Sequence, residues 1–234
     1  MKKYNFNEKE LFDLFVNKNN LTIPLITMKP YRRDGCVYGT DCRKLIKVKE
    51  DILSGEYETT DEMKIEFPMQ NCDYTVTESD LRKVLSEIPQ EEETETVGQN
   101  IKCPECDGDG TVWWEYRDKK FETHEAEHDC PICDGSGYVE KEKTRKTGRM
   151  IPSPIQIIKV GKNNIMSGYL QILLDAMNII RVSEVRLVCQ TEVFNHFKID
   201  DNISIMFASN SLAADYEMPL SGYKDSRERP EKPW

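Results

Sequence analysis

The sequence has few of the features by which enzymes and membrane proteins are usually recognised. It contains three histidines and no phosphate-binding loop, zinc-protease helix, serine-hydrolase elbow or dinucleotide-binding glycine motif. No apolar run approaches the ~18–20 residues of a membrane-spanning helix, and the N-terminus lacks the apolar core of a signal peptide. We therefore expect a non-enzymatic, cytoplasmic chain without a membrane partner.

The charge balance is acidic. Asp and Glu number 42 against 32 Lys and Arg, which gives a formal net charge of −10 over 234 residues. Such a chain is not expected to coat nucleic acid with its whole surface, although a local basic patch stays open. With 8 Phe, 10 Tyr and 3 Trp, the chain has enough aromatic residues for a folded core, which excludes full disorder.

Four of the eight cysteines form two copies of one motif, C-P-x-C-D-G-x-G, which begin at Cys103 and Cys130. A two-residue gap lets both thiolates of one tight turn bind the same ion, and two such turns complete a closed tetrahedral zinc site. The glycines supply the positive φ that the turns need. The motif therefore predicts one Zn²⁺ per chain, held by Cys103, Cys106, Cys130 and Cys133.

Other interpretations of the cysteines and histidines are weaker. Disulfides do not suit a chain without a signal peptide, and the glycines would break the helix that follows a redox C-x-x-C. His124 and His128 lie between the two motifs and are alternative ligands, whereas His196 is predicted to be a strand residue. The remaining cysteines lie in or beside apolar strands and are expected to be buried thiols, with a second metal or redox site at Cys36 and Cys42 as the alternative: Cys36, Cys42, Cys72 and Cys189.

The C-x-x-C-x-G-x-G repeats resemble the cysteine-rich domain of DnaJ-type co-chaperones. That family has four repeats and two zinc ions, so two repeats imply one zinc ion. The resemblance covers only residues 101–139. The J-domain signature His-Pro-Asp is absent, so the co-chaperone role does not transfer.

The zinc module is the most acidic part of the chain. Residues 103–137 contain ten acidic and three basic residues, a net charge of −7. A zinc finger that reads DNA should be basic, so DNA is not expected to bind here. Between the two motifs, residues 111–116 are strand-like and aromatic. Trp113 and Trp114 either pack over the zinc hairpin or anchor a protein partner.

The module interrupts a host domain. An acidic run at residues 89–96 and a mixed, then basic run at residues 140–149 lack apolar periodicity and are predicted to be exposed or mobile linkers. The expected organisation is a first host half, an inserted zinc module, a second host half and a disordered tail. These parts are residues 1–90, 99–140, 150–217 and 218–234.

The two host halves share the pattern βαβββ. In the first, a strand at residues 3–6 precedes a helix at residues 8–18 that Asn7 caps; in the second, a strand at residues 155–160 precedes a helix that Ser167 caps. Three strands are expected after each helix, and a further strand and a Thr77-capped helix with Asp80 in a capping box extend the first half. The strands are expected at residues 21–27, 36–39, 45–49, 63–67, 185–189, 194–199 and 203–207.

This pattern and its wording resemble the DNA sliding clamp. The stretch 166–177, with its Tyr169-Leu170 pair, is similar to the clamp's last helix, and the Thr40-Asp41 strand pair resembles the family's A-T-D-x-x-x-L. The resemblance implies an α+β fold of two βαβββ halves with an inserted zinc-ribbon hairpin, and no catalytic residue. The clamp's apolar residues followed by Met-Pro, near which its partner-peptide groove forms, are replaced by Phe207-Ala208-Ser209-Asn210.

The resemblance implies a role in DNA replication or DNA metabolism. A clamp ring needs about six such domains, so this chain would need to form a homo-oligomer of six copies. DNA would bind the host domain through bases that either contact DNA or form a solvated strand edge: Arg32, Arg33, Arg43, Lys44 and Lys47. The alternative is a chaperone-like or adaptor module in which the acidic zinc ribbon binds a partner polypeptide. A metal-dependent or thiol enzyme lacks a recognisable constellation.

Overall fold

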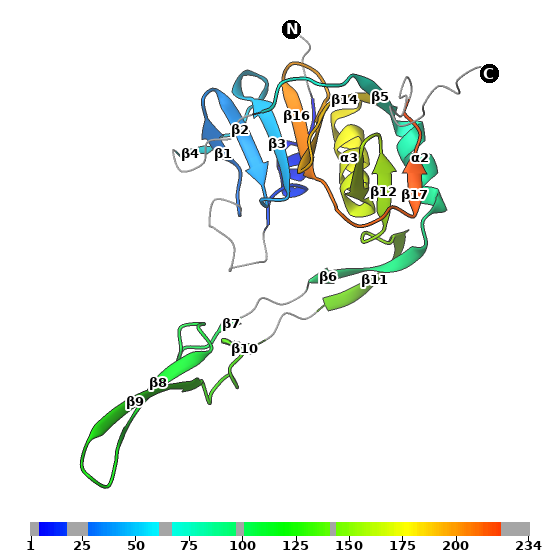
Figure 1. Cartoon of the computed structure of the whole chain (residues 1–234). Coiled ribbons are helices and arrows are strands. Elements are labelled where there is room, and N and C mark those ends of the chain that lie inside the picture. Colours follow the sequence, from blue (N-terminus) through cyan, green and yellow to red (C-terminus); the bar gives the residue numbers. More distant parts are fainter. Residues whose placement is uncertain (1–4, 18–27, 61–66, 97–100, 141–143, 221–234) are drawn as a thin grey trace, which may run out of the picture. The chain divides into compact units, whose positions relative to one another are not determined.

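The computed structural model describes residues 5–17, 28–60, 67–96, 101–140 and 144–220 (Figure 1). The chain forms two compact units. Unit 1 comprises Met1–Glu91 and Pro152–Trp234, and unit 2 comprises Glu92–Ile151. No helix in the described part of the chain has the length and apolar character needed to cross a membrane.

Unit 1 is built on a mixed sheet in the order β4-β1-β2-β3-β16-β15-β14-β5. Its strands are β1 (Tyr31–Arg33), β2 (Cys36–Thr40), β3 (Lys44–Lys49), β4 (Glu58–Thr59), β5 (Tyr74–Thr77), β14 (Glu184–Gln190), β15 (Phe194–Lys198) and β16 (Ile203–Ala208). The predicted strands at 36–39, 45–49, 185–189, 194–199 and 203–207 are thereby confirmed to within two residues. Those at 21–27 and 63–67 lie wholly or mostly outside the described residues.

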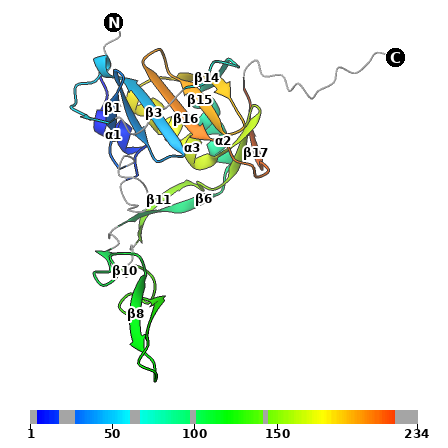
Figure 2. The same cartoon turned by 60° about the vertical axis from the view of Figure 1, so that its left-hand side comes forward.

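The two halves meet at the centre of this sheet. Antiparallel pairing places Ile46 of β3 opposite Ile205 of β16, and Figure 2 shows these two strands side by side. A helix followed by three antiparallel strands is present on each side of this junction, α1 (Glu8–Asp13) in the first half and α3 (Ser167–Ile180) in the second. The structure is α+β, as expected.

The strand that precedes α3 differs from the prediction. The chain enters α3 directly from β13 (Asn163–Met166), whereas the predicted strand corresponds to β12 (Ile157–Val160). Both belong to a small separate sheet, in the order β13-β12-β17, with β17 at Tyr216–Met218. Residues 3 and 4 of the strand expected before α1 lie outside the described part of the chain. Residues 5 and 6 are described and are not in a strand.

Local capping signals explain where the helices begin. The Asn7 side chain accepts a hydrogen bond from the backbone N–H of Glu10 and caps α1. Thr77 and Asp80 form the predicted capping box of α2 (Glu78–Glu87). The prediction that Ser167 caps α3 is wrong: Met166 is the cap residue, and Ser167 is the first helical residue and donates its hydroxyl to the Ser153 carbonyl.

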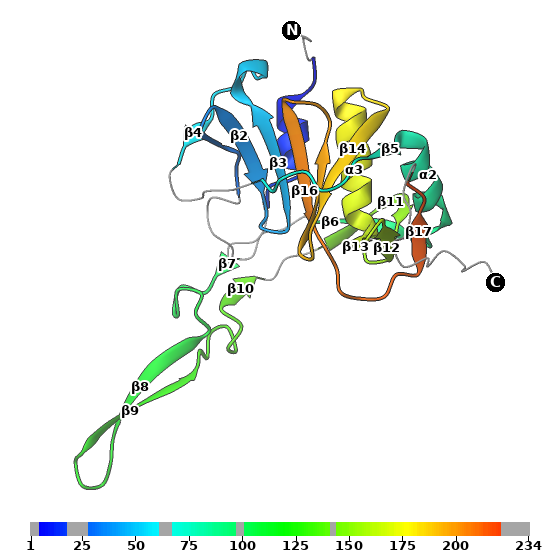
Figure 3. The same ribbon diagram turned by 45° about the horizontal axis from the view of Figure 1, so that its top comes forward.

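The core lies between the helices and one face of the large sheet (Figure 3). Fully buried side chains such as Phe12 of α1, Leu173 of α3 and Phe207 of β16 meet there. A smaller apolar cluster of Tyr31, Cys36, Tyr38 and Leu45 lies elsewhere, with Phe67 and Met206 packed against it. Since β2 is buried along its whole length, both faces of the sheet are covered at that strand.

The end of the described chain belongs to the fold. Met218 of β17 is 1% exposed and Leu220 is 9% exposed, and both join the main core. The expected tail from residue 218 therefore begins too early, because β17 pairs in parallel with β12 and buries its last side chain. Residues 221–234 lie outside the described part.

Unit 2 consists of short antiparallel pairs. The two segments predicted to be linkers instead pair with each other. They form a two-stranded ribbon of β6 (Gln90–Thr96) and β11 (Thr144–Pro152). Opposite charges across the ribbon explain this pairing, for Lys146 contacts Glu92 at 2.8 Å and Arg145 binds Glu95. The other pairs are β7 (Ile101–Lys102) with β10 (Tyr138–Glu140), and β8 (Thr111–Arg117) with β9 (Thr123–Asp129). In unit 1, a short 3₁₀ turn, Glu50–Ile52, follows β3.

Candidate metal centre and candidate binding surfaces

Each cysteine motif folds into a tight turn whose backbone points at sulfur. The N–H of Gly110 donates to Sγ of Cys106 at 3.3 Å, and the N–H of Gly137 donates to Sγ of Cys133 at 3.2 Å. Both glycines have a positive φ, of 83° and 75°, which a residue with a Cβ adopts only at a cost. The repeated glycine is therefore required by the turn.

The two cysteine turns have the same structure and also contact each other. The Cys103 N–H donates to the Gly137 carbonyl, and the Cys130 N–H donates to the Gly110 carbonyl, each at 2.8 Å. A Cβ at Gly110 would lie 2.5 Å from the carbonyl oxygen of Gly135, and one at Gly137 would clash with the Gly108 carbonyl. Each turn therefore packs on the backbone of the other.

This packing brings the four predicted ligands together. Their Sγ atoms all lie within 4.8 Å of one another, and the Cys103–Cys130 and Cys106–Cys133 pairs are both 3.8 Å apart. All four side chains are buried. Burial raises the pKa of Cys106, but N–H donors from Gly110 and Gly108, together with hydrogen bonds to Cys133 and Cys103, lower that pKa to about 7. The cluster could hold a metal ion.

The histidines between the motifs have other partners. The His128 ring lies 5.1 Å from that of Trp114, and the His124 ring stacks on Tyr116 at 5.3 Å. His124 also contacts Asp118 at 3.4 Å. Neither histidine belongs to the sulfur cluster, so the alternative ligand set that includes them is not formed.

The aromatic hairpin is formed by β8 and β9 as the sequence predicts, but its tryptophans are exposed. Trp113 is 70% exposed and Trp114 is 51% exposed. The apolar side chain that packs on the cysteine cluster is Val112. The cysteine cluster itself is closed by its own turns and by Val112, while Trp114 packs on the hairpin through its contact with His128.

The candidate nucleic-acid residues are not gathered on one face of the sheet. Arg32 lies opposite Val37 and Lys44 opposite Phe207, which places both on the face that packs against the helices. The side chain of Lys47 lies on the other face, with its Nζ 5.0 Å from the ring centroid of Phe67.

Several of these bases already have acidic partners. Arg32 binds Glu50 at 2.8 Å, and Lys44 contacts Asp41 at 3.6 Å. Arg33 is paired with Asp34 at 3.3 Å. Burial lowers the pKa of Lys44, which Asp41 partly offsets. Sequence proximity therefore does not translate into one shared basic patch.

An apolar pocket lies where the two halves meet. Its volume is about 380 Å³, and its walls are the turn between β2 and β3, the turn before β15 and the end of β16. These are residues 40, 42–45, 193–194 and 206–208. The sequence did not predict this pocket, because its walls come from segments more than 140 positions apart. The only local indication was the Thr40-Asp41 pair, which resembles the sliding-clamp sequence.

The unpatterned cysteines occupy different environments. Cys36 and Cys189 are buried, Cys72 is half-buried, and Cys42 is exposed. Burial raises the pKa of Cys36, Cys72 and Cys189. The expectation of four buried thiols is wrong for Cys42, because it occupies the left-handed position of the β2–β3 turn at φ 73°. No second metal cluster joins Cys36 and Cys42 in the described residues.

His196 is a strand residue, as predicted. It lies in β15 with 7% of its surface exposed, and its ring meets that of Phe67 edge-on at 4.9 Å. Neither ring nitrogen has a hydrogen-bond partner among the described residues. Burial, together with Lys198 and Lys47, lowers its pKa to about 4.

No family model and no curated protein matches the chain. Among solved structures, it is similar to DNA polymerase III beta subunits. With that of Thermotoga maritima it shares 9% identity at a TM-score of 0.40, covering 88% of this chain and 64% of that one. The Borrelia burgdorferi subunit is 10% identical at a TM-score of 0.36, and the match covers 91% of this chain and 65% of that one. The Caulobacter crescentus subunit is 9% identical at a TM-score of 0.34, and the match covers 79% of this chain and 57% of that one. This chain thus spans less than two thirds of the length of each.

Proposed function

We propose that this chain is a non-enzymatic, zinc-binding accessory protein of DNA replication or DNA metabolism, whose host domain binds a short segment of a partner polypeptide. The observation that carries the proposal is the apolar pocket at the junction of β2, β3, β15 and β16. It lies beside the turn whose Thr40-Asp41 sequence resembles the sliding clamp.

The chemistry of the pocket suits an apolar side chain. Met206 and Phe207 line it, and Val193, which is 66% exposed, stands at its edge. Arg43 is exposed and also lines it, which would allow a charge-assisted hydrogen bond to a carbonyl or carboxylate of the bound segment. Apolar walls with a few polar groups are typical of ligand sites.

Cys42 provides a direct test, because it lines the pocket and is exposed. We expect an acetylated ten-residue peptide with a Leu-Phe pair to slow iodoacetamide alkylation of Cys42, followed by peptide mass spectrometry. A peptide with Ser-Ser in place of the pair serves as the control. Val193→Lys should abolish the protection, because it places a charge at the apolar edge. Absence of protection at 1 mM peptide, or protection unchanged by Val193→Lys, would contradict the pocket as a peptide site.

The metal is proposed to be a single structural Zn²⁺. Zinc–thiolate bonds are about 2.3 Å long, and four of them in a tetrahedron separate neighbouring sulfurs by about 3.8 Å. Both measured pairs match this separation, whereas a disulfide would require about 2.05 Å. We expect one zinc per chain by elemental analysis, lost in Cys103→Ser while the host domain stays folded. Two metals per chain, or none, would contradict the single site.

DNA is proposed to bind the host domain and not the acidic module. A chain in which residues 99–140 are replaced by a short Gly-Ser linker should therefore retain salt-dependent binding to a labelled duplex. Light scattering on the same samples reports the oligomeric state, since a ring would need about six copies. Loss of duplex binding with the deletion would instead favour the module as the site.

A further inference from the structure

The β8–β9 hairpin has two unlike faces, because residues directly opposite in an antiparallel pair lie on the same face. One face pairs Trp114 with Ala126 and Tyr116 with His124, while Val112 faces His128. Trp114 lies against the ring of His128 and Tyr116 stacks on His124, while Val112 packs on the cysteine cluster. Their packing gives this face a structural role.

The second face, here called the acidic face, carries a single aromatic side chain among acids. Trp113 lies opposite Glu127, Glu115 opposite Glu125, and Asp129 opposite Thr111. Arg117, near the hairpin tip, is the only base among the strand residues of this face. The acidic face therefore combines four carboxylates with one large, 70% exposed indole.

The carboxylates of this face lack compensation within the part of unit 2 that the structure describes. Glu115 and Glu125 oppose each other directly, an arrangement that destabilises a sheet, and no ion pair to either is formed by the described residues. Glu127 accepts a hydrogen bond from the Thr111 hydroxyl at 2.7 Å, which leaves its negative charge in place. A cation from outside the module would relieve this repulsion.

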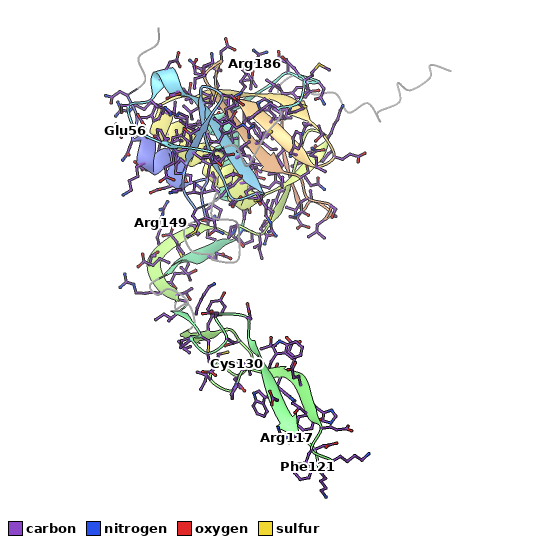
Figure 4. The ribbon with its side chains drawn as sticks, turned by 90° about the vertical axis from the view of Figure 1, so that its left-hand side faces the viewer. Glu56, Arg117, Phe121, Cys130, Arg149 and Arg186 are labelled. Carbon is purple, nitrogen blue, oxygen red and sulfur yellow. The ribbon has the colours of Figure 1, made fainter. Side chains whose placement is uncertain are left out.

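The tip of the β8–β9 hairpin also carries an exposed aromatic side chain. Phe121 is 81% exposed and adopts a left-handed backbone, with φ at 67°, and Figure 4 places it at the tip, away from Cys130. An aromatic residue is rarely tolerated there. Exposed aromatic side chains are typical anchors for protein partners.

We propose that the acidic face binds a lysine- or arginine-rich segment of a partner polypeptide. Trp113 would stack on the aliphatic stem and cation of one basic side chain, and Glu115, Glu125 and Glu127 would accept the neighbouring ones. The net charge of −7 on residues 103–137 would steer a basic segment toward the hairpin and repel nucleic acid. The proposal concerns unit 2 alone and does not depend on the pocket of the host domain.

The test uses the full-length, zinc-loaded chain and a fluorescein-labelled twelve-residue peptide of Lys, Arg and Leu, followed by fluorescence anisotropy. We expect saturable binding that weakens as salt rises from 50 to 300 mM. Trp113→Ala should raise the Kd at least about tenfold, as for an interface anchor. Glu115→Gln with Glu125→Gln should raise it about fourfold, as for two exposed ion pairs.

A matched variant separates this face from bulk charge. Glu105→Gln with Glu122→Gln removes the same two charges elsewhere in the module, and its Kd should stay within about twofold of the parent. Zinc content is measured for every variant, so that a lost fold is not mistaken for a lost contact.

Any one of four results would overturn the proposal. The control pair could weaken binding as much as the Glu115 and Glu125 pair, Trp113→Ala could have no effect, or the peptide could fail to bind at 1 mM. Tighter binding of a labelled single-stranded oligonucleotide than of the basic peptide would identify nucleic acid as the occupant and also refute it.

Discussion

A methyl group added at Gly137 should weaken metal binding far more than the same group added at Gly148. Both glycines have a left-handed backbone, with φ of 75° and 79°. A Cβ at Gly148 meets nothing within 4 Å, whereas a Cβ at Gly137 clashes with the carbonyl oxygen of Gly108 in the other cysteine turn. The Gly148 variant therefore carries the same backbone strain outside the cysteine turns, whereas the Gly137 variant places both the strain and the clash within them.

The expected loss of zinc affinity in Gly137→Ala can be worked out from the contacts that the clash disturbs. The left-handed backbone costs an L-residue roughly 1–2 kcal/mol in either variant. In Gly137→Ala the turn must also move away from Gly108, which disturbs the N–H that donates to Sγ of Cys133 at 3.2 Å. A hydrogen bond to a charged acceptor is worth about 1.5–3 kcal/mol. The additional loss of about 2 kcal/mol corresponds to roughly a thirtyfold weaker affinity for the metal.

Competition against a chromogenic zinc chelator measures this affinity in full-length protein. The strain at Gly148 lies in the β6–β11 ribbon, outside the cysteine turns, so Gly148→Ala should keep the parent affinity to within about twofold. Gly110→Ala should behave like Gly137→Ala, because its Cβ would lie 2.5 Å from the Gly135 carbonyl oxygen. Equal zinc affinities for the Gly137 and Gly148 variants would refute the argument that the two turns hold the site by mutual contact.

Three further predictions concern stability. Thr77→Ala removes the side chain that accepts the Asp80 N–H and should lower the free energy of unfolding by about 1 kcal/mol in urea titrations; an unchanged midpoint would contradict the cap. The pKa of His196 is about 4 in the folded chain against 6.5 ordinarily. The unfolded chain therefore binds more protons between these values, and the free energy of unfolding should fall as the pH falls from 6.5 toward 4, by up to about 1.4 kcal/mol per unit. His196→Gln should flatten that pH dependence, and an identical profile would show that other groups cause it. Phe121→Gly should relieve the left-handed strain and slow amide exchange in β8 and β9; faster exchange would indicate that the phenyl ring stabilises the hairpin.

The helix caps and the central strands could be predicted from the sequence, because the residues that cause them lie close together in the chain. Asn7, Thr77 and Asp80 cap their helices because a side-chain oxygen three residues from an unpaired N–H needs no tertiary partner. The Ser167 prediction failed because tertiary contacts replace the cap: the N–H groups of Ser167 and Gly168 donate to the carbonyls of Gln156 and Pro154, and Ser167 is already helical. Apolar periodicity also predicted the central strands correctly, because alternation reports burial directly.

The predicted linkers show the opposite case. A run of acids and a run of bases, each without apolar periodicity, look like linkers when each is considered alone. The structure pairs them as β6 and β11, with Arg145 bound to Glu95. The complementary charge was readable in the sequence, but the pairing itself joins two segments about 50 residues apart and is seen only in the fold.

The sequence by itself determined the four-cysteine cluster, the acidic charge of the module and the central strands of the large sheet, because spacing, composition and periodicity act within a few residues. Tertiary structure alone decided that Trp113 stays exposed while Val112 covers the cysteines, and that the basic residues divide between the two faces of the sheet. It also formed the pocket from residues 42–45, 193–194 and 206–208. A strand's own residues determine only that successive side chains point to opposite faces of the sheet. Which of those faces is buried depends on the distant strands that pair with it.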